Sequence, residues 1–214
     1  MMQRSVDILV AALVLVFLTP IFVTVSLIIV LGSPGNPFYG GWRIGKNGRR
    51  FRMWKFRTMV TGADRMGGSI AATGDPRITR VGRFLRATKI DELPQFFNLL
   101  LGDLTLVGPR PEDPAIVAHY TSEQLQTLKV KPGITGPGQI YYTTDQVASI
   151  PTGVSADQYY LEHLLDKKLR RDLDYLKLRT PLSDCHVVWQ TIVLMARALA
   201  GAVGNQRSLK FIKH

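Results

Sequence analysis

Two adjacent carboxylates are the side chains of this sequence best placed to do chemistry. Asp91 and Glu92 lie next to each other, and Pro94 follows almost at once. Basic residues flank the pair on both sides: Arg83, Arg86, Lys89 and, within a rigid Pro-Arg-Pro, Arg110. Carboxylates bind Mg²⁺ through oxygen, while arginine and lysine neutralise phosphates. A carboxylate can also attack phosphorus and form an acyl phosphate, so the pair is a candidate for phosphoryl transfer.

A structural role for the same pair stays open. The segment 91–102, "DELPQFFNLLLG", reads as a helix with acids in its first turn and a glycine near its end. Acids there would cap backbone N–H groups and suit the helix dipole. On spacing alone the capping role is favoured. The cationic surroundings favour phosphoryl chemistry instead, since a nucleic-acid-binding surface would keep acids away from its basic patch.

The N-terminal segment predicts insertion into a membrane. From Ile8 to Leu31 about 24 residues carry no charge, enough for a helix to reach across a hydrocarbon core of about 30 Å. This run is too long for a secretory signal. Pro20 should kink the helix, and the Thr19 hydroxyl can bond back to the backbone. Basic residues after the run place the rest of the chain in the cytoplasm. The residues alone leave open a spanning helix or one that bends at Thr19-Pro20 and returns.

The remainder predicts a mixed α+β domain that is mostly helical and has a small β-hairpin. The hairpin turn is expected at Asn47-Gly48, because this pair supplies positive φ at both turn positions. A linker is expected at 32–41 and loops at 60–77 and 131–145. Helices are expected over 78–88, 91–102, within 112–130, over 155–179 and over 184–201.

The segment 155–179 is the most amphipathic of these helices. Its leucines form one stripe, and the basic residues Lys167, Lys168, Arg170 and Arg171 occupy the remaining surface. A helix that covers the core is favoured. A helix that lies on anionic lipid is the alternative.

Composition narrows the partners without choosing among them. The 214 residues carry a formal net charge of +11, which suits nucleic acid, an anionic membrane or a phosphate-rich substrate. A single cysteine, Cys185, excludes an internal disulfide, and four scattered histidines argue against zinc chemistry. No Gly-x-Gly-x-x-Gly follows a predicted strand, so a Rossmann domain is not expected.

Three sequence blocks carry a family resemblance. They are "KFRTM" from Lys55, "DELPQFFNLLLGDLTLVGPRPE" from Asp91, and "KPGITGPGQ" from Lys131. In this order, after an N-terminal membrane segment, they resemble the signature blocks of the bacterial sugar transferases, the monotopic phosphoglycosyl transferases. The resemblance covers nearly the whole chain.

The resemblance implies a reaction and a set of roles. A sugar-1-phosphate moves from a UDP-sugar to a polyprenyl phosphate, typically undecaprenyl phosphate, and UMP leaves. Asp91 would be the nucleophile of a covalent phosphosugar intermediate. Glu92 would take part in Mg²⁺ binding or proton handling, with Mg²⁺ as the cofactor at Asp91 and Glu92. Phosphate binding would fall to Lys55, Arg86 and Arg110.

The resemblance also implies a location. The family's membrane segment is re-entrant and broken at a Ser-Pro pair, for which Thr19-Pro20 stands here. We expect a membrane-inserted segment over 1–36 and a catalytic domain over 37–214, on the cytoplasmic face of the bacterial inner membrane. The expected form is minimal, without the additional transmembrane helices of larger relatives. Membrane lipid is an expected partner and nucleic acid is not, and a homo-oligomer stays open.

One departure leaves the sugar undetermined. The family often has an arginine near the donor where this sequence has Thr143. Two other classes of function also stay open. One is a membrane-anchored binder of nucleic acid or anionic lipid, which would explain the charge. The other is a non-catalytic scaffold of a glycan assembly complex that has kept the fold.

Overall fold

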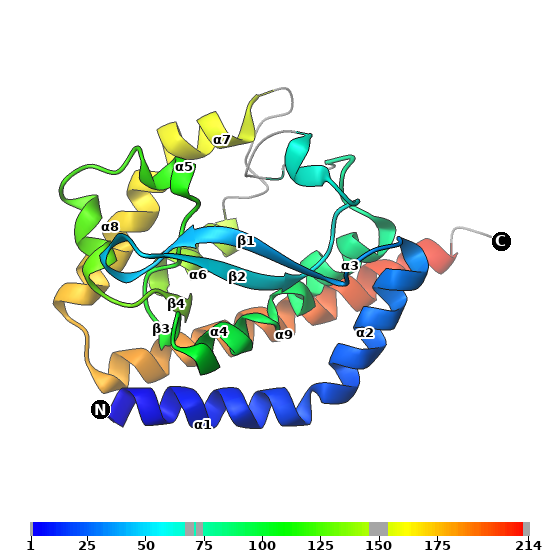
Figure 1. The fold of residues 1–214 in the computed structure, drawn as a ribbon, viewed down its shortest axis with the longest axis horizontal. Coiled ribbons are helices and arrows are strands. Elements are labelled where there is room, and N and C mark those ends of the chain that lie inside the picture. The colour runs from blue at the N-terminus through cyan, green and yellow to red at the C-terminus, as the bar shows by residue number, and fades with distance from the viewer. Residues whose placement is uncertain (1, 67–70, 72–74, 146–153, 212–214) are drawn as a thin grey trace.

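The computed structural model describes residues 2–66, 71, 75–145 and 154–211, without the side chains of 2, 143–145 and 202–211. The expected fold class is confirmed: the described residues form a mostly helical α+β structure with two small two-stranded sheets. The hairpin crosses the middle of Figure 1, and helices lie on either side of it.

The N-terminal apolar segment is a bent pair of helices. Helix α1 (Met2–Phe17) and helix α2 (Thr19–Gly32) meet at Leu18, and their axes differ by 60°. Pro20 cannot donate a backbone hydrogen bond, and the Thr19 hydroxyl donates to the Leu15 carbonyl at 2.8 Å. Within the described residues no single helix is long and apolar enough to cross a membrane, but the bent pair together has the required length and composition. The predicted bend is confirmed.

The predicted hairpin is also confirmed. Strands β1 (Phe38–Ile44) and β2 (Arg50–Phe56) are antiparallel. They are joined by a turn in which Asn47 has φ of 56° and Gly48 has φ of 77°. The linker is shorter than expected, because β1 already begins at Phe38.

The two middle segments differ from expectation. The acids do not begin a helix: they lie in a separate 3₁₀ turn, Ile90–Glu92, and helix α4 (Gln95–Leu101) begins after Pro94. The expected loop 131–145 is wrong, since it contains strand β4 (Gly133–Thr135) and helix α6 (Pro137–Asp145). Strand β4 pairs in parallel with β3 (Thr105–Val107). A Cβ at Gly133 would lie 2.2 Å from the Gly108 nitrogen, so glycine serves close backbone approach here rather than a loop.

The remaining short elements lie before the acid-bearing turn and after β3. Helix α3 (Arg80–Thr88) confirms the helix expected over 78–88. Short helices follow at α5 (Pro114–Val117), a 3₁₀ segment at Gln124–Lys129 and α7 (Ala156–Tyr159). A short 3₁₀ turn at Ala63–Arg65 lies in the expected loop 60–77, part of which is outside the described residues.

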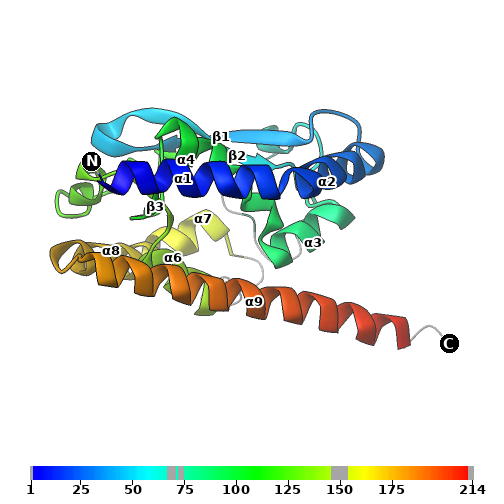
Figure 2. The same cartoon turned by 90° about the horizontal axis from the view of Figure 1, so that it is seen from below.

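Two long helices complete the chain. A π turn at Tyr160–Leu164 leads into α8 (Leu165–Lys177), and α9 (Pro181–Phe211) follows. Leucines of 155–179 pack in the core, as favoured, but Lys168 is buried rather than exposed. In Figure 1 α1 runs along the lower side of the molecule, whereas α9 rises from the lower left to the right; Figure 2 shows both helices from below.

Candidate active site

A tight turn presents the two carboxylates. Helix α3 ends at Thr88, Lys89 follows with a left-handed φ of 61°, and the chain reverses into the 3₁₀ turn that holds Asp91 and Glu92. A non-glycine residue in this region is uncommon and marks a constrained turn. Neither acid caps a helix, because no side-chain capping bond forms at the start of the 3₁₀ turn or of α4. The capping interpretation of the pair is therefore wrong.

Glu92 lies between two cations from distant parts of the chain. Lys55 Nζ donates to Glu92 Oε1 at 2.9 Å. Arg110 Nη2 donates to the same oxygen at 2.6 Å, and Arg110 Nη1 donates to Oε2 at 3.3 Å. The contact is bidentate and charge-assisted, the geometry in which arginine binds carboxylates most strongly. The predicted residues Lys55, Glu92 and Arg110 therefore meet in one network.

A buried asparagine holds β2 against α4 and so sets the place of Lys55. Asn98 is fully buried; its Oδ1 accepts from Trp54 N at 2.9 Å, and its Nδ2 donates to Arg52 O at 2.7 Å. These bonds use free backbone groups of the strand that carries Lys55. The lysine is thereby directed at the turn that precedes α4.

The two acids have opposite electrostatic environments. Burial acts to raise the pKa of Glu92, but the charges of Arg110 and Lys55 outweigh it and hold that pKa well below its ordinary value. Burial raises the pKa of Asp91, and the Lys55 charge opposes this only in part. Burial disfavours the charged form of Lys55 too, and it therefore lowers the pKa of this lysine. Neighbouring groups whose environments separate their pKa values are typical of catalytic sites.

Asp91 is the acid with unused bonding capacity. Its side chain is 4% exposed, and its Oδ1 atom has no hydrogen-bond partner among the described residues. Both polar side-chain atoms of Gln95, one helical turn later, are also buried without a described partner. A buried polar atom without a partner is costly, so such atoms point to a ligand, an ion or water. Asp91 Oδ1 therefore has bonding capacity that another group could use.

Arg86 reaches the site from α3. Its Nε donates to Thr58 Oγ1 at 3.1 Å, and its charge acts to lower the pKa of Asp91. Thr58 comes close because Gly82 allows it: a Cβ at Gly82 would lie 1.9 Å from the Thr58 carbonyl oxygen. Arg86 is thus placed near the acid pair, but it bonds to a threonine rather than to either acid.

A second buried polar cluster was missed by the sequence reasoning. Glu112 accepts from Lys168 Nζ and, at 2.5 Å, from the Tyr160 hydroxyl. Asp172 Oδ1 accepts from Gly138 N at 2.9 Å, and burial raises the pKa of Asp172 to about 6. The signal was the spacing of Lys168 and Asp172, which places both on the leucine face of the helix. The cluster joins α8 to the segment that carries Arg110.

The site fits Mg²⁺ only if substrate phosphates supply part of the coordination. Among the described residues no group of three or more His, Cys, Asp or Glu side chains could hold a metal ion. Mg²⁺ is commonly bound by one or two carboxylates together with substrate phosphates, and the unpartnered Asp91 Oδ1 suits that mode. Both Glu92 oxygens already accept from cations. Among the described residues Oε2 accepts only the longer bond, from Arg110, so this oxygen keeps a lone pair, and a metal role for Glu92 stays a prediction.

An apolar groove lies at the bend of the N-terminal helices. It has a volume of about 590 Å³ and is lined by Leu15, Val16, Thr19, Phe22, Val23, Ser26, Leu27, Phe38 and Phe97. The Phe22 ring packs on Phe56, 5.2 Å between centroids, and Phe56 directly follows Lys55. The groove is therefore linked by packing to the strand that carries a site cation. Thr143 lies in α6, but its side chain is outside the described residues.

This geometry defines a class: a small α+β domain in which carboxylates and cations for phosphate chemistry adjoin a bent apolar helix pair. Residues 1–198 match the family model described as bacterial sugar transferase. The chain belongs to the bacterial sugar transferase family.

Named relatives agree with this membership. The chain is 36% identical over 200 residues to UDP-glucose:undecaprenyl-phosphate glucose-1-phosphate transferase of Escherichia coli, covering 90% of this chain and 39% of the relative. It is 35% identical over 193 residues to UDP-N-acetylgalactosamine-undecaprenyl-phosphate N-acetylgalactosaminephosphotransferase of Aeromonas hydrophila, covering 89% of this chain and 42% of the relative. A putative undecaprenyl-phosphate N-acetylgalactosaminyl 1-phosphate transferase of Bacillus subtilis is 41% identical over 121 residues, covering 56% of this chain and 68% of the relative. The chain thus spans about two fifths of the length of the first two.

Proposed function

We propose that this protein transfers a sugar-1-phosphate from a UDP-sugar to undecaprenyl phosphate and releases UMP. The observation that carries the proposal is the buried, unpartnered Asp91 oxygen beside a carboxylate bound by Lys55 and Arg110. The names of the relatives, which specify UDP-sugars and undecaprenyl phosphate, support the two substrates.

The proposed mechanism uses Asp91 as the nucleophile. An Asp91 oxygen attacks the phosphorus next to the sugar, and the bond from this phosphorus to the bridging oxygen breaks. UMP leaves with the electron pair, and an aspartyl phosphosugar remains. A phosphate oxygen of the polyprenyl phosphate then attacks the same phosphorus, and Asp91 departs as a carboxylate. The product is a polyprenyl diphosphate sugar.

The cations act on the charge of the phosphates. Lys55 and Arg110 both form ion pairs with Glu92, and these pairs fix the positions of the two cations. Their remaining N–H donors stay available for phosphate oxygens. Arg86 adds positive charge from α3. Mg²⁺, held by Asp91 and the donor phosphates, would supply further charge neutralisation on the diphosphate. Such pre-placed positive groups stabilise the transition state more than they stabilise either substrate.

The membrane location follows from the same proposal. Residues 1–36 would insert into the cytoplasmic leaflet of a bacterial inner membrane, and 37–214 would form the catalytic domain at its surface. The apolar groove at the bend and the exposed apolar side chains of the helix pair, such as Val16 and Leu31, support this placement. A site at headgroup depth would meet the lipid phosphate without moving it across the bilayer.

The test is UMP release from a panel of UDP-sugars with undecaprenyl phosphate and Mg²⁺. Wild type should release UMP with one donor, and Asp91→Asn should release none while it remains membrane-bound. Asp174→Asn is the matched control, because Asp174 is exposed and its one ion pair among the described residues is with Lys177. Without acceptor, intact-mass measurement should show one phosphosugar on wild type and none on Asp91→Asn. Full turnover by Asp91→Asn would refute the nucleophile, and no release by folded wild type with any donor would favour the scaffold alternative.

A further inference from the structure

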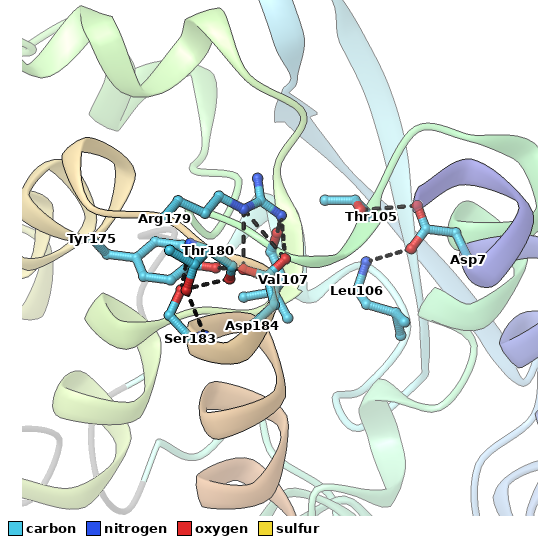
Figure 3. Close-up of polar contacts among 9 residues, drawn as sticks. All are labelled: Asp7, Thr105, Leu106, Val107, Tyr175, Arg179, Thr180, Ser183 and Asp184. Carbon is cyan, nitrogen blue, oxygen red and sulfur yellow. Dashed lines mark hydrogen bonds and ion pairs between the residues drawn. The ribbon is translucent and has the colours of Figure 1, made fainter. Parts of the chain in front are cut away.

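The strand that leads into Arg110 is held by the N-terminal helix. Strand β3 ends at Val107, and Gly108, Pro109 and Arg110 follow directly. Figure 3 shows Asp7 of α1 reaching this strand. Asp7 Oδ2 accepts from the Thr105 hydroxyl at 2.9 Å, and Oδ1 accepts from the Leu106 backbone N–H at 3.1 Å.

The opposite side of β3 is held by the corner between α8 and α9. Arg179 Nη2 donates to the Val107 carbonyl at 2.9 Å and to Asp184 Oδ2 at 2.9 Å. Strand β4 adds a parallel partner. The path of β3 is therefore fixed by two charged side chains, and one of them belongs to the bent apolar pair.

Helix α1 also touches the element that follows the acid pair. Arg4 Nη1 donates to the Leu99 carbonyl at 2.6 Å, and Nη2 donates to the Leu100 carbonyl at 2.7 Å. These carbonyls lie in the last turn of α4, where a cation is favoured. One helix thus contacts α4, which follows Glu92, and β3, which precedes Arg110.

Asp7 is out of place for a helix that only inserts into lipid. It is 3% exposed, whereas its neighbours on α1 include the exposed side chains of Val6 and Leu9. A carboxylate at this position is costly in an apolar environment unless it is hydrogen-bonded. Both of its oxygens are bonded, and both bonds go to β3. Packing of α1 against the domain would not by itself require an acid.

We propose that Asp7 is a positioning residue: it ties β3 to α1 and so holds Arg110 in register with Glu92 only when the N-terminal helix is docked. The role of Arg110 in this statement rests on the proposed function. The tie itself is a property of the fold and can be tested without turnover.

The first experiment measures amide hydrogen exchange over 104–110 in detergent micelles. Loss of charge-assisted bonds in Asp7→Ala should raise exchange of this segment by about tenfold to a hundredfold. Asp7→Asn should stay close to wild type, since an amide can accept from Leu106 N–H and donate to the Thr105 hydroxyl. Leu9→Ala, on the exposed side of α1, is the control. Unchanged exchange in Asp7→Ala would overturn the proposal. If Asp7→Ala does not fold, the same measurement is made on Thr105→Val, which removes one of the two bonds.

The second experiment asks whether Asp7 acts through Arg110. We expect Asp7→Ala to lower kcat/KM for UMP release by about tenfold in wild type, and to have little further effect in an Arg110→Ala background. Equal losses of kcat/KM in both backgrounds would show that Asp7 only stabilises the fold in general, and would overturn the positioning role. If wild type releases no UMP, the proposed function fails, and the exchange result alone still decides whether Asp7 fixes the strand.

Discussion

Replacement of Lys168 by methionine should destabilise the protein strongly. The Lys168 side chain is 3% exposed, forms an ion pair with Glu112, and its Nζ lies 3.0 Å from the Tyr160 hydroxyl. Methionine keeps much of the apolar volume but removes the charge. The Glu112 carboxylate would then stay largely buried without its ion-pair partner.

The size of the effect follows from this geometry. Removal of one partner of a buried ion pair costs about 3–5 kcal/mol. Glu112 is 14% exposed and keeps the Tyr160 bond, so the lower end, about 3 kcal/mol, is expected. For a chain of this size each kcal/mol shifts Tm by about 2–4 °C, so the melting temperature should fall by about 6–12 °C.

The loss of stability in Lys168→Met should also depend on pH. Burial acts to raise the pKa of Glu112, but Lys168 and the hydrogen bonds from Lys168 and Tyr160 outweigh it and lower that pKa. In wild type this stabilisation is present above the unfolded-state pKa and is lost as the pH falls through the folded value. In Lys168→Met the unpaired carboxylate should have a raised pKa instead. Protonation then relieves its cost, so the difference between the two proteins should narrow as the pH falls through about 4.5.

The assay is thermal unfolding followed by tryptophan fluorescence in one detergent across this pH range. Lys167→Met is the matched control, because Lys167 is exposed on the same helix. The double variant Lys168→Met with Glu112→Gln should recover part of the loss, since no buried charge remains. A Lys168→Met protein that melts within about 2 °C of the Lys167→Met control would refute the reasoning, because such a shift is near 1 kcal/mol or less.

Three further predictions concern the site and the bend. Because the charge of Lys55 acts to lower the pKa of Asp91 against burial, Lys55→Met should move the acid limb of the pH profile of kcat/KM to higher pH, and an unmoved limb would contradict this. Gly82→Ala should cost about 1–3 kcal/mol by chemical denaturation, since its Cβ would meet the Thr58 carbonyl oxygen; wild-type stability would disprove that close approach. Pro20→Ala should straighten the N-terminal pair and expose an N-terminal cysteine to labelling from the opposite side of the membrane, whereas labelling from the domain side would show that proline does not set the bend.

Local chemistry was readable from the sequence. Proline bends a helix, so Pro20 predicts a bend in the apolar segment, and Asn47-Gly48 predicts a hairpin turn. Both effects depend on backbone groups within a few residues. Candidate site residues were also named in advance, through the sequence blocks that carry the family resemblance, and their roles stay predictions. The blocks named them without saying which of them touch.

Features that depend on contacts far along the chain were not readable. The segment 131–145 looked like a loop because its glycines suggest turns, but Gly133 is there to let two strands meet. Lys168 looked exposed because lysine usually is, although its spacing put it on the leucine stripe. Asp7 was not singled out by the sequence analysis, since its partners lie 98 and 99 residues away.

The sequence by itself determined that an acid pair, several cations and a bent apolar segment belong to one chain. The tertiary structure decided how the two acids differ. Lys55 and Arg110 lie 37 and 18 residues from Glu92, and the fold brings both to that side chain. Asp91, adjacent in sequence, is buried, and its Oδ1 has no such partner in the described part of the chain. Neighbouring carboxylates acquire different pKa values only from the charges and burial that surround them in three dimensions.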